Sequence, residues 1–379
     1  MKLIHLSDLH FGKRFNEFSL IEDQKYIIER IYKIIDDEKP QGVIIAGDVY
    51  DRSVPSTEAV ELFDEFLVKL CSMGLSVYIA SGNHDSAERL SFGNRLLAAS
   101  KVYLSSAYKG DIKPVVATDD YGEFNIYLLP FIKPALIRAV YDDAEISSYT
   151  DAVKFAIEKM NVDYSRRNII VAHQFVTGAT TCESEIFAVG GADNVDATVF
   201  ENFDYTALGH IHGPQNIGSE KIRYCGTPLK YSFSEENHKK SVTVVELKEK
   251  GDLTVKTVPL TPYSDVVTLK GTYDELMCKD FYEGKSYPND YVRIILTDED
   301  EVPNALNNLR IVYPKIAEMR YDNTRSRSNG VLDADEKIKN KSEFEIFSEF
   351  YELQNGTPLG DEARKFVENI IEEIKEGQR

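Results

Sequence analysis

Residues 42–51 read GVIIAGDVYD, and this stretch decides the fold class of the chain. Its apolar first half has the length of a buried strand, and the polar half begins directly at Gly47-Asp48. Open α/β sheets place their ligand sites at the carboxyl ends of strands. The stretch therefore predicts a buried strand that delivers an acidic side chain to a site.

Four further polar clusters follow apolar runs in the same way, and each contains residues of the types that ligate metals. They are Asp8-Leu9-His10, Gly82-Asn83-His84-Asp85, Val171-Ala172-His173 and Gly209-His210-Ile211-His212. The chain has only 7 histidines, and five of them lie in these clusters. We therefore expect a metal centre, and we expect His5 and His238, which lie outside the clusters, to be structural or solvated.

Strand-length apolar runs alternate with helical patterns over the first 260 residues. Strands are expected at 3–6, 42–46, 77–80, 126–129, 169–172, 206–208, 242–247 and 253–260. Helical spacing of apolar residues occurs around 27–35, 60–70 and 152–160. Residues 1–260 are therefore predicted to form an α/β domain in which all five clusters meet at one sheet edge.

The composition is that of an ordinary globular protein, and at 379 residues the chain exceeds the size of one growing core. No apolar stretch approaches the roughly 18 residues of a membrane span, so a cytoplasmic location is expected. The four cysteines are far apart, which favours neither disulfides nor a thiolate zinc site.

The net charge of −19 argues against a nucleic-acid partner, because phosphate contacts dominate such binding. Screening beyond about 8 Å nevertheless weakens the effect of distant acidic groups, so a local basic or metallic patch can outweigh the acidic surface. An acidic chain that acts on DNA is expected to borrow basic surface from another subunit.

The last third of the sequence changes character. Residues 263–322 predict a small αβ domain, 323–341 a polar linker and 342–379 a helical tail that begins with a capping box. The tail carries two apolar stripes, Phe344, Phe347, Phe350 and Tyr351, then Phe366, Val367, Ile370 and Ile371. These helices either fold back on the body or hold a helix of a partner.

Seven side chains in the clusters are candidate metal ligands: Asp8, His10, Asp48, Asn83, His173, His210 and His212. The number suits two metal ions that share one carboxylate, and mixed nitrogen and oxygen ligands favour Mn, Fe or Zn over Ca or Mg. Two divalent cations outweigh the charges of Asp8 and Asp48, so the site attracts a phosphodiester and activates water.

A leaving alkoxide needs a proton, and His84 is the expected supplier because it adjoins the ligand Asn83. The carboxylate of Asp51 is expected to orient the ring of His84. Arg52 and Asp85 either contact the substrate or form local salt bridges.

Taken together, the five clusters resemble the signature of the calcineurin-like metallophosphoesterases. The runs GHIHGPQ at 209–215 and YCGTPLKYSFSE at 224–235 are similar to the DNA-repair nucleases of that family. The resemblance implies a two-layered β-sandwich flanked by helices, with a small α+β capping domain and a helical tail. It also implies Mn as the metal, one ion on Asp8, His10, Asp48 and His212, the other on Asp48, Asn83, His173 and His210, and His84 as the catalytic histidine.

The same resemblance implies a partner and a substrate. Nucleases of this branch cut double-stranded DNA ends and hairpins in repair and recombination, in the cytoplasm with the nucleoid. They act as dimers with an SMC-like ATPase, whose coiled-coil base is held by the C-terminal helices of the nuclease. Segments near 60–70 and 86–99 are the candidates for dimer contacts.

This chain departs from the eukaryotic and archaeal relatives at one position, where Asp51 replaces a histidine, so a second catalytic histidine is not expected. Two alternatives to a DNA nuclease stay open. One is a phosphoesterase for small phosphodiesters or phosphoproteins, and the other is a binding scaffold with a vestigial site.

Overall fold

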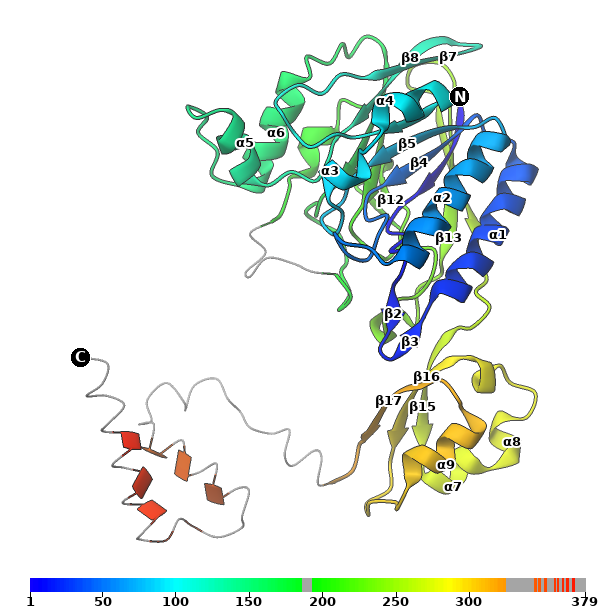
Figure 1. Ribbon diagram of the computed structural model, residues 1–379, viewed down its shortest axis with the longest axis vertical. Coiled ribbons are helices and arrows are strands. Elements are labelled where there is room, and N and C mark those ends of the chain that lie inside the picture. The colour runs from blue at the N-terminus through cyan, green and yellow to red at the C-terminus, as the bar shows by residue number, and fades with distance from the viewer. Residues whose placement is uncertain are drawn as a thin grey trace. The chain divides into compact units, whose positions relative to one another are not determined.

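The structure, a computed structural model, describes residues 1–185 and 193–324 and single positions between 344 and 371 (Figure 1). The chain forms two compact units, Met1–Leu296 with Val302–Arg320 and Thr297–Glu301 with Tyr321–Arg379. In the second unit, the side chain of Asn323 donates a hydrogen bond to the carbonyl of Asp298 at 3.0 Å. No helix among the described residues is long and apolar enough to cross a membrane.

Two six-stranded sheets form the centre of the first unit. In one sheet the order is β14-β13-β1-β4-β5-β6, with β1, β4, β5 and β6 parallel. Its strands are β1 (Lys2–Leu6), β4 (Gly42–Ala46), β5 (Ser76–Ala80), β6 (Val102–Leu104), β13 (Ser241–Leu247) and β14 (Leu253–Pro259).

The second sheet has the order β11-β12-β10-β9-β8-β7, with β8, β9, β10 and β12 parallel. Its strands are β7 (Val115–Asp119), β8 (Gly122–Leu128), β9 (Arg167–His173), β10 (Tyr205–Gly209), β11 (Gln215–Ile217) and β12 (Ser219–Tyr224). Each of the strands predicted from apolar runs is present in one of these sheets.

The alternation of side chains along β4 shows why its sequence is apolar throughout. Ile44 and Ala46 pack with residues of the second sheet, whereas Val43 and Ile45 pack with the helices on the outer face. Those helices are α1 (Ile21–Glu38) and α2 (Thr57–Ser72). Their apolar stripes were recognised from helical spacing, and they contact one face of the sheet.

On the other side of the sandwich, α5 (Pro134–Val140) and α6 (Tyr149–Lys159) pack against the second sheet (Figure 1). The result is the α/β domain that the sequence pattern predicted, in the form of the two-layered β-sandwich flanked by helices that the family resemblance implied. The segment 86–99 contains two short helices, α3 (Ala87–Leu90) and α4 (Asn94–Leu97), because Gly93 between them has a φ of 74°.

Smaller elements complete the first unit. They are the hairpin β2 (Arg14–Phe15) and β3 (Phe18–Ser19), and 3₁₀ turns η1 (Ala98–Ser100), η3 (Ala197–Phe200), η4 (Phe233–Glu235) and η5 (Tyr287–Asn289). A third sheet contains β15 (Val266–Gly271), β16 (Tyr291–Leu296) and β17 (Ile316–Tyr321), with α7 (Tyr273–Met277), α8 (Lys279–Tyr282) and α9 (Ala305–Val312).

The three-stranded sheet is joined to the sandwich by polar and aromatic contacts. The hydroxyl of Tyr291 donates to Asp23 at 2.8 Å, and its ring stacks on Phe15. Thr268 donates to the carboxylate of Glu236 at 2.6 Å. The segment expected to form a small αβ module therefore packs directly on the body that carries the five clusters.

Part of the predicted linker and tail lies outside the described residues, including 325–341 and Phe350. Of the described tail residues, Phe347 and Phe366 are exposed. Ile370 is also exposed, and Phe344, Tyr351, Val367 and Ile371 are partly buried.

Candidate metal centre

The five clusters all lie at the carboxyl ends of strands in the two sheets. Asp8 and His10 follow β1, Asp48 follows β4, and Asn83 and His84 follow β5. His173 is the last residue of β9, and His210 and His212 follow β10. The structure therefore brings the seven predicted ligands from both sheets to one place, and all but Asn83 are buried.

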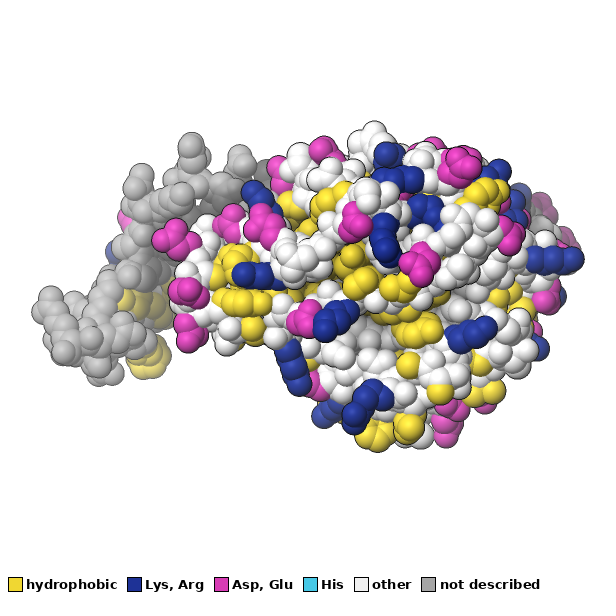
Figure 2. Space-filling view, turned by 90° about the horizontal axis from the view of Figure 1, so that it is seen from above, with side chains coloured by type: hydrophobic (Ala, Val, Ile, Leu, Met, Phe, Trp, Pro, Cys, Tyr) yellow, Lys and Arg dark blue, Asp and Glu magenta, His cyan; other side chains and the backbone are white. Residues whose placement is uncertain are grey.

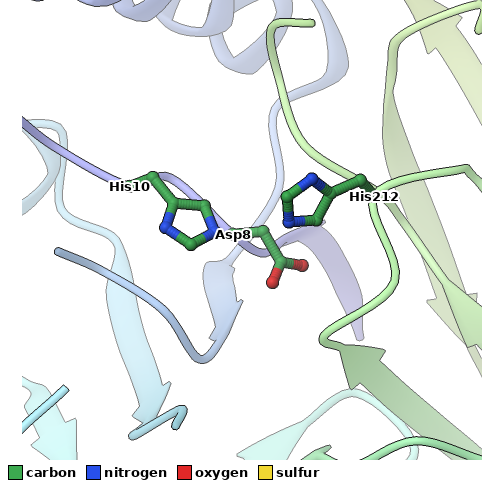
Figure 3. Close-up of side chains that lie close together, drawn as sticks. All are labelled: Asp8, His10 and His212. Atoms are coloured by element: carbon green, nitrogen blue, oxygen red, sulfur yellow. The ribbon is translucent and has the colours of Figure 1, made fainter. Parts of the chain in front are cut away.

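One subsite contains the side chains of Asp8, His10 and His212, whose potential ligand atoms lie within 4.8 Å of one another (Figure 3). Both ring nitrogens of His10 are buried and have no hydrogen-bond partner. Burying two ring nitrogens without partners costs free energy unless another group accepts the N–H or binds the lone pair. The subsite thus fits a cation that accepts the lone pair of His10.

The second subsite contains Asp48, Asn83, His173 and His210. Nε2 of His173 lies 3.2 Å from Oδ2 of Asp48 and 3.0 Å from Oδ1 of Asn83, and Nδ1 of His210 lies 3.0 Å from the same Asn83 oxygen. The Nδ1–H of His173 donates to the carbonyl of Ala46 at 2.9 Å. Nε2 therefore faces two oxygen atoms, an arrangement that requires a positive charge, and either a proton on Nε2 or a metal cation supplies it.

The titration behaviour of these groups reflects burial and mutual charge. Burial raises the pKa of Asp8 to about 6. Burial lowers the pKa of His173, but the carboxylates of Asp48 and Asp8 outweigh that effect and raise the pKa to about 9. Burial and the neighbouring His173 lower the pKa of His210 to about 3. Strongly shifted groups of both signs in one cluster are typical of functional sites.

Four candidate ligand residues adopt a left-handed backbone although none is glycine. The φ angles of Asp8, His10, Asp48 and His210 are 52°, 45°, 49° and 102°. Each such residue costs roughly 1–3 kcal/mol, and such strain clusters at functional sites. Hydrogen bonds between the loops offset it: the N–H groups of Asp8 and His10 donate to the carbonyls of Gly47 and Asp48, both at 3.0 Å.

Glycines within three of the clusters permit this close approach of loops. A Cβ atom at Gly47 would lie 2.2 Å from Nδ1 of His173, and one at Gly82 would lie 2.1 Å from Oδ1 of Asp48. At Gly209 it would lie 1.8 Å from the carbonyl oxygen of Ala46. No other residue type leaves space for the ligands at these three positions.

His84 lies beside the ligands, and its contacts differ in one respect from the sequence-based expectation. Its Nδ1–H donates to the backbone carbonyl of Asp51 at 2.9 Å, not to the carboxylate. That carboxylate lies 2.8 Å from Nζ of Lys13 and 3.7 Å from Nδ1 of His10. Nε2 of His84 is directed to the ligand side, 4.0 Å from Oδ2 of Asp48.

The two residues with alternative roles behave differently. The carboxylate of Asp85 accepts hydrogen bonds from the backbone N–H groups of Val49, Tyr50 and Gly82, at 3.2, 3.1 and 2.9 Å. It therefore links the loops after β4 and β5. The side chain of Arg52 is 78% exposed, and its Nε lies 3.7 Å from a carboxylate oxygen of Asp51, so it remains accessible to a ligand.

A buried residue that the sequence did not single out supports the loop after β1. Gln24 of α1 donates to the carbonyl of His10 at 2.8 Å and is 1% exposed. The signal in the sequence was a polar residue in line with the apolar stripe Ile27, Ile28 and Ile31 of α1. His5 is buried between the sheets, where its Nδ1 lies 2.8 Å from the hydroxyl of Tyr205.

Comparisons with known proteins show which family the chain is similar to. Residues 1–214 match the family model of the calcineurin-like phosphoesterases, and residues 262–355 match the "Type 5 capsule protein repressor C-terminal domain". The SbcD component of the nuclease SbcCD from Staphylococcus epidermidis is 30% identical over 98% of this chain and 98% of its own length. The same component from Staphylococcus saprophyticus is 30% identical over 99% of each chain.

A solved structure of a dimetal phosphatase from Danio rerio is similar over 69% of this chain and 98% of its own, with 11% identity and a TM-score of 0.36. This likeness is distant, and the ligand assignment rests on the residues of the chain itself.

Proposed function

The chain belongs to the calcineurin-like phosphoesterase family, and we propose that it is the nuclease component of an SbcCD-type complex, which hydrolyses phosphodiester bonds of DNA ends and hairpins. As a member of this family it is a metal-dependent hydrolase of phosphate esters. The observation that carries the proposal is the convergence of seven ligand side chains into two adjoining subsites. The full-length similarity to two SbcD proteins supports DNA as the substrate.

The proposed ligands divide between two divalent ions, for which we propose Mn²⁺. Asp8, His10 and His212 hold one ion and Asn83, His173 and His210 the other, with Asp48 shared. Ions of this kind supply Lewis acidity to a phosphodiester and provide hydroxide near neutral pH.

His84 is proposed as the residue that protonates the leaving oxygen. When both ring nitrogens carry protons, Nδ1–H remains bonded to the carbonyl of Asp51 and Nε2–H is directed to the ligand side. The carbonyl thus keeps the ring oriented in both protonation states, so that the proton is delivered from Nε2. Asp51 acts here through its backbone, while its carboxylate holds Lys13.

Substrate and partner contacts form the outer part of the proposal. The exposed guanidinium of Arg52 contacts a phosphate of DNA, and Asp85 shapes the adjacent loops without contacting the substrate. The segment 263–322 orients duplex DNA over the metal ions. On the face drawn in Figure 2, basic and acidic side chains of the described residues are interspersed, which favours a partner that supplies additional basic surface.

We assign that role to an SMC-like ATPase, SbcC, bound through the apolar stripes of the tail. A homodimer within a heterotetramer completes the assembly, with the segment around Phe92 and Leu96, which are 85% and 80% exposed, as a candidate contact. The complex is proposed to act in the cytoplasm with the nucleoid, in double-strand break repair and recombination.

The test uses purified chain with Mn²⁺, end-labelled duplex and hairpin DNA, and a nitrophenyl phosphodiester, with and without the ATPase. We expect cleavage of DNA that depends on the metal. His84→Ala is expected to bind two ions but to cleave DNA about 10²–10⁴-fold more slowly. Hydrolysis of the small diester with no cleavage of DNA in either condition would refute the nuclease, and full activity of His84→Ala would refute the role of His84.

A further inference from the structure

The proposed ligand His212 is held on three sides by buried charged side chains that the mechanism does not use. Its ring Nδ1–H is shared between two acceptors, Oγ of Ser184 at 3.0 Å and Oε1 of Glu235 at 3.1 Å. Its carbonyl oxygen accepts from Nζ of Lys240 at 2.9 Å, and its N–H donates to Oε1 of Glu185 at 2.8 Å. The side chains of Glu235 and Lys240 are 0% and 3% exposed.

Glu235 and Lys240 form a direct ion pair, with Nζ 2.5 Å from Oε2. Ser184 donates to Oε1 of Glu235 at 2.6 Å, and the N–H of Tyr231 donates to the same oxygen at 3.2 Å. The lysine also donates to the hydroxyl of Thr227 at 2.6 Å. Each charge of the pair is therefore surrounded by hydrogen-bonding groups, which is the condition under which a buried ion pair persists.

The orientation of the His212 ring follows from these contacts. Because Nδ1 carries the proton that Glu235 accepts, the lone pair of the neutral ring resides on Nε2. His212 shares the first subsite with Asp8 and His10 (Figure 3). A carboxylate that accepts from a ligating histidine fixes the ring and strengthens its donation to the metal.

We infer that Glu235 and Lys240 are positioning residues for His212: the carboxylate fixes the ring through Nδ1, and the ammonium fixes the backbone through the carbonyl. This inference rests on the proposed metal-dependent function. It predicts that loss of the pair weakens the binding of one of the two metal ions and leaves the binding of the other unchanged, because the second subsite contains none of the residues that the pair contacts.

The test replaces both charges together, so that neither is left buried alone: Glu235→Leu with Lys240→Met. Replacing a buried ion pair by an apolar pair of similar volume often leaves stability unchanged, so we expect the double variant to fold. Glu235→Gln with Lys240→Met is the conservative companion, since the amide oxygen still accepts from Nδ1. The control is Asp119→Asn with Arg167→Met, which removes another buried ion pair. The amide oxygen at position 119 still accepts from the N-terminal ammonium, the second partner of Asp119. Arg167 is at the amino end of β9, whereas His173 is at its carboxyl end.

Mn²⁺ is titrated into each folded variant and followed by electron paramagnetic resonance, which distinguishes a single Mn²⁺ from a coupled pair. For the Leu/Met variant we expect about 10–100-fold weaker binding of one ion, the other ion retained, and a single-ion spectrum at concentrations where the wild type shows a coupled pair. The Gln/Met companion is expected to recover part of this affinity, and the control to bind as the wild type does.

Wild-type affinity for both ions in the folded Leu/Met variant would overturn the positioning role. An equal loss in the control, or an equal loss of both ions in the Leu/Met variant, would also overturn it, because each indicates a general structural effect. The wild-type titration is read separately: if the unmodified chain binds no pair of ions, the proposed metal-dependent function fails and not the positioning of His212.

Discussion

Replacing Gly47 with alanine tests the idea that the metal centre depends on close approach of the loops. Gly47 has a φ of 84°, and an added Cβ would lie 2.2 Å from Nδ1 and 2.5 Å from Cγ of His173. The imidazole is fully buried and bonded to the carbonyl of Ala46, so it has no free space to enter. The substitution therefore displaces a proposed metal ligand from the second subsite.

The cost has two parts that a control separates. A left-handed alanine costs roughly 1–2 kcal/mol, and the overpacking against His173 adds roughly 1–3 kcal/mol. Gly74 has a similar φ of 79° with nothing within 4 Å of its Cβ position, so Gly74→Ala carries the first cost alone. We expect Gly47→Ala to lower the free energy of unfolding by about 2–5 kcal/mol and Gly74→Ala by about 1–2 kcal/mol.

Both variants are unfolded in urea without metal, and their Mn²⁺ affinities are then measured by competition with a chelator. Gly47→Ala is expected to lower the affinity for one Mn²⁺ ion about tenfold or more, as the loss of a group that orients a ligand does. Gly74→Ala is expected to leave both affinities unchanged. Equal destabilisation by the two substitutions, or unchanged metal binding by Gly47→Ala, would refute the reasoning.

Three further predictions follow from the contacts. Asp85→Ala leaves the three N–H groups of Val49, Tyr50 and Gly82 without their acceptor. At about 1–3 kcal/mol for each buried donor, we expect the free energy of unfolding in urea to fall by at least about 3 kcal/mol. Asp85→Asn should lower it less, and equal losses for the two variants would contradict the loop-linking role. Hydrogen bonds from Ser147 and Ser148 lower the pKa of Asp151 from 3.8 to about 2. Its ionised form therefore stabilises the fold above pH 4, and the difference in urea midpoint between the wild type and Asp151→Asn should shrink as the pH falls from about 4 to 2. A difference that is constant over this range would exclude the assignment. Removal of residues 342–379 should abolish binding of the ATPase partner, measured by co-purification, and preserve metal-dependent hydrolysis of a small diester, whereas retained partner binding would assign those helices to the body.

The fold and the position of the centre were predictable because both follow from local patterns. A strand buried on both faces, such as β4, requires a continuous apolar run, and the residues after such a run lie at the sheet edge by geometry alone. Histidine is rare in this chain, so its concentration at these positions was informative. The convergence of the candidate ligands was predictable for this reason without knowledge of the order of the strands.

The surroundings of the ligands were less predictable, because they depend on contacts between residues distant in sequence. Asp51 is three residues beyond Asp48, and its side chain was expected to contact His84. The backbone carbonyl of Asp51 contacts His84 instead, while the carboxylate pairs with Lys13, and no sequence pattern places a lysine 38 positions away beside that carboxylate. Lys240 likewise reaches His212 across 28 positions, through a fold that brings the start of β13 near the loop after β10.

The left-handed candidate ligands show why the five clusters form one centre and not five separate sites. Asp8 is held by Gly47 of the next loop, and its carboxylate accepts the N–H of His210 at 3.0 Å. The carboxylate of Asp48 in turn accepts the N–H of His84 at 2.9 Å. Each strained backbone is thus stabilised by a residue of another cluster, and loss of one ligand side chain removes the restraint on a second. Substitutions of Asp8 and His210 are therefore expected to be non-additive in their effect on stability, as for residues that share one hydrogen-bond network.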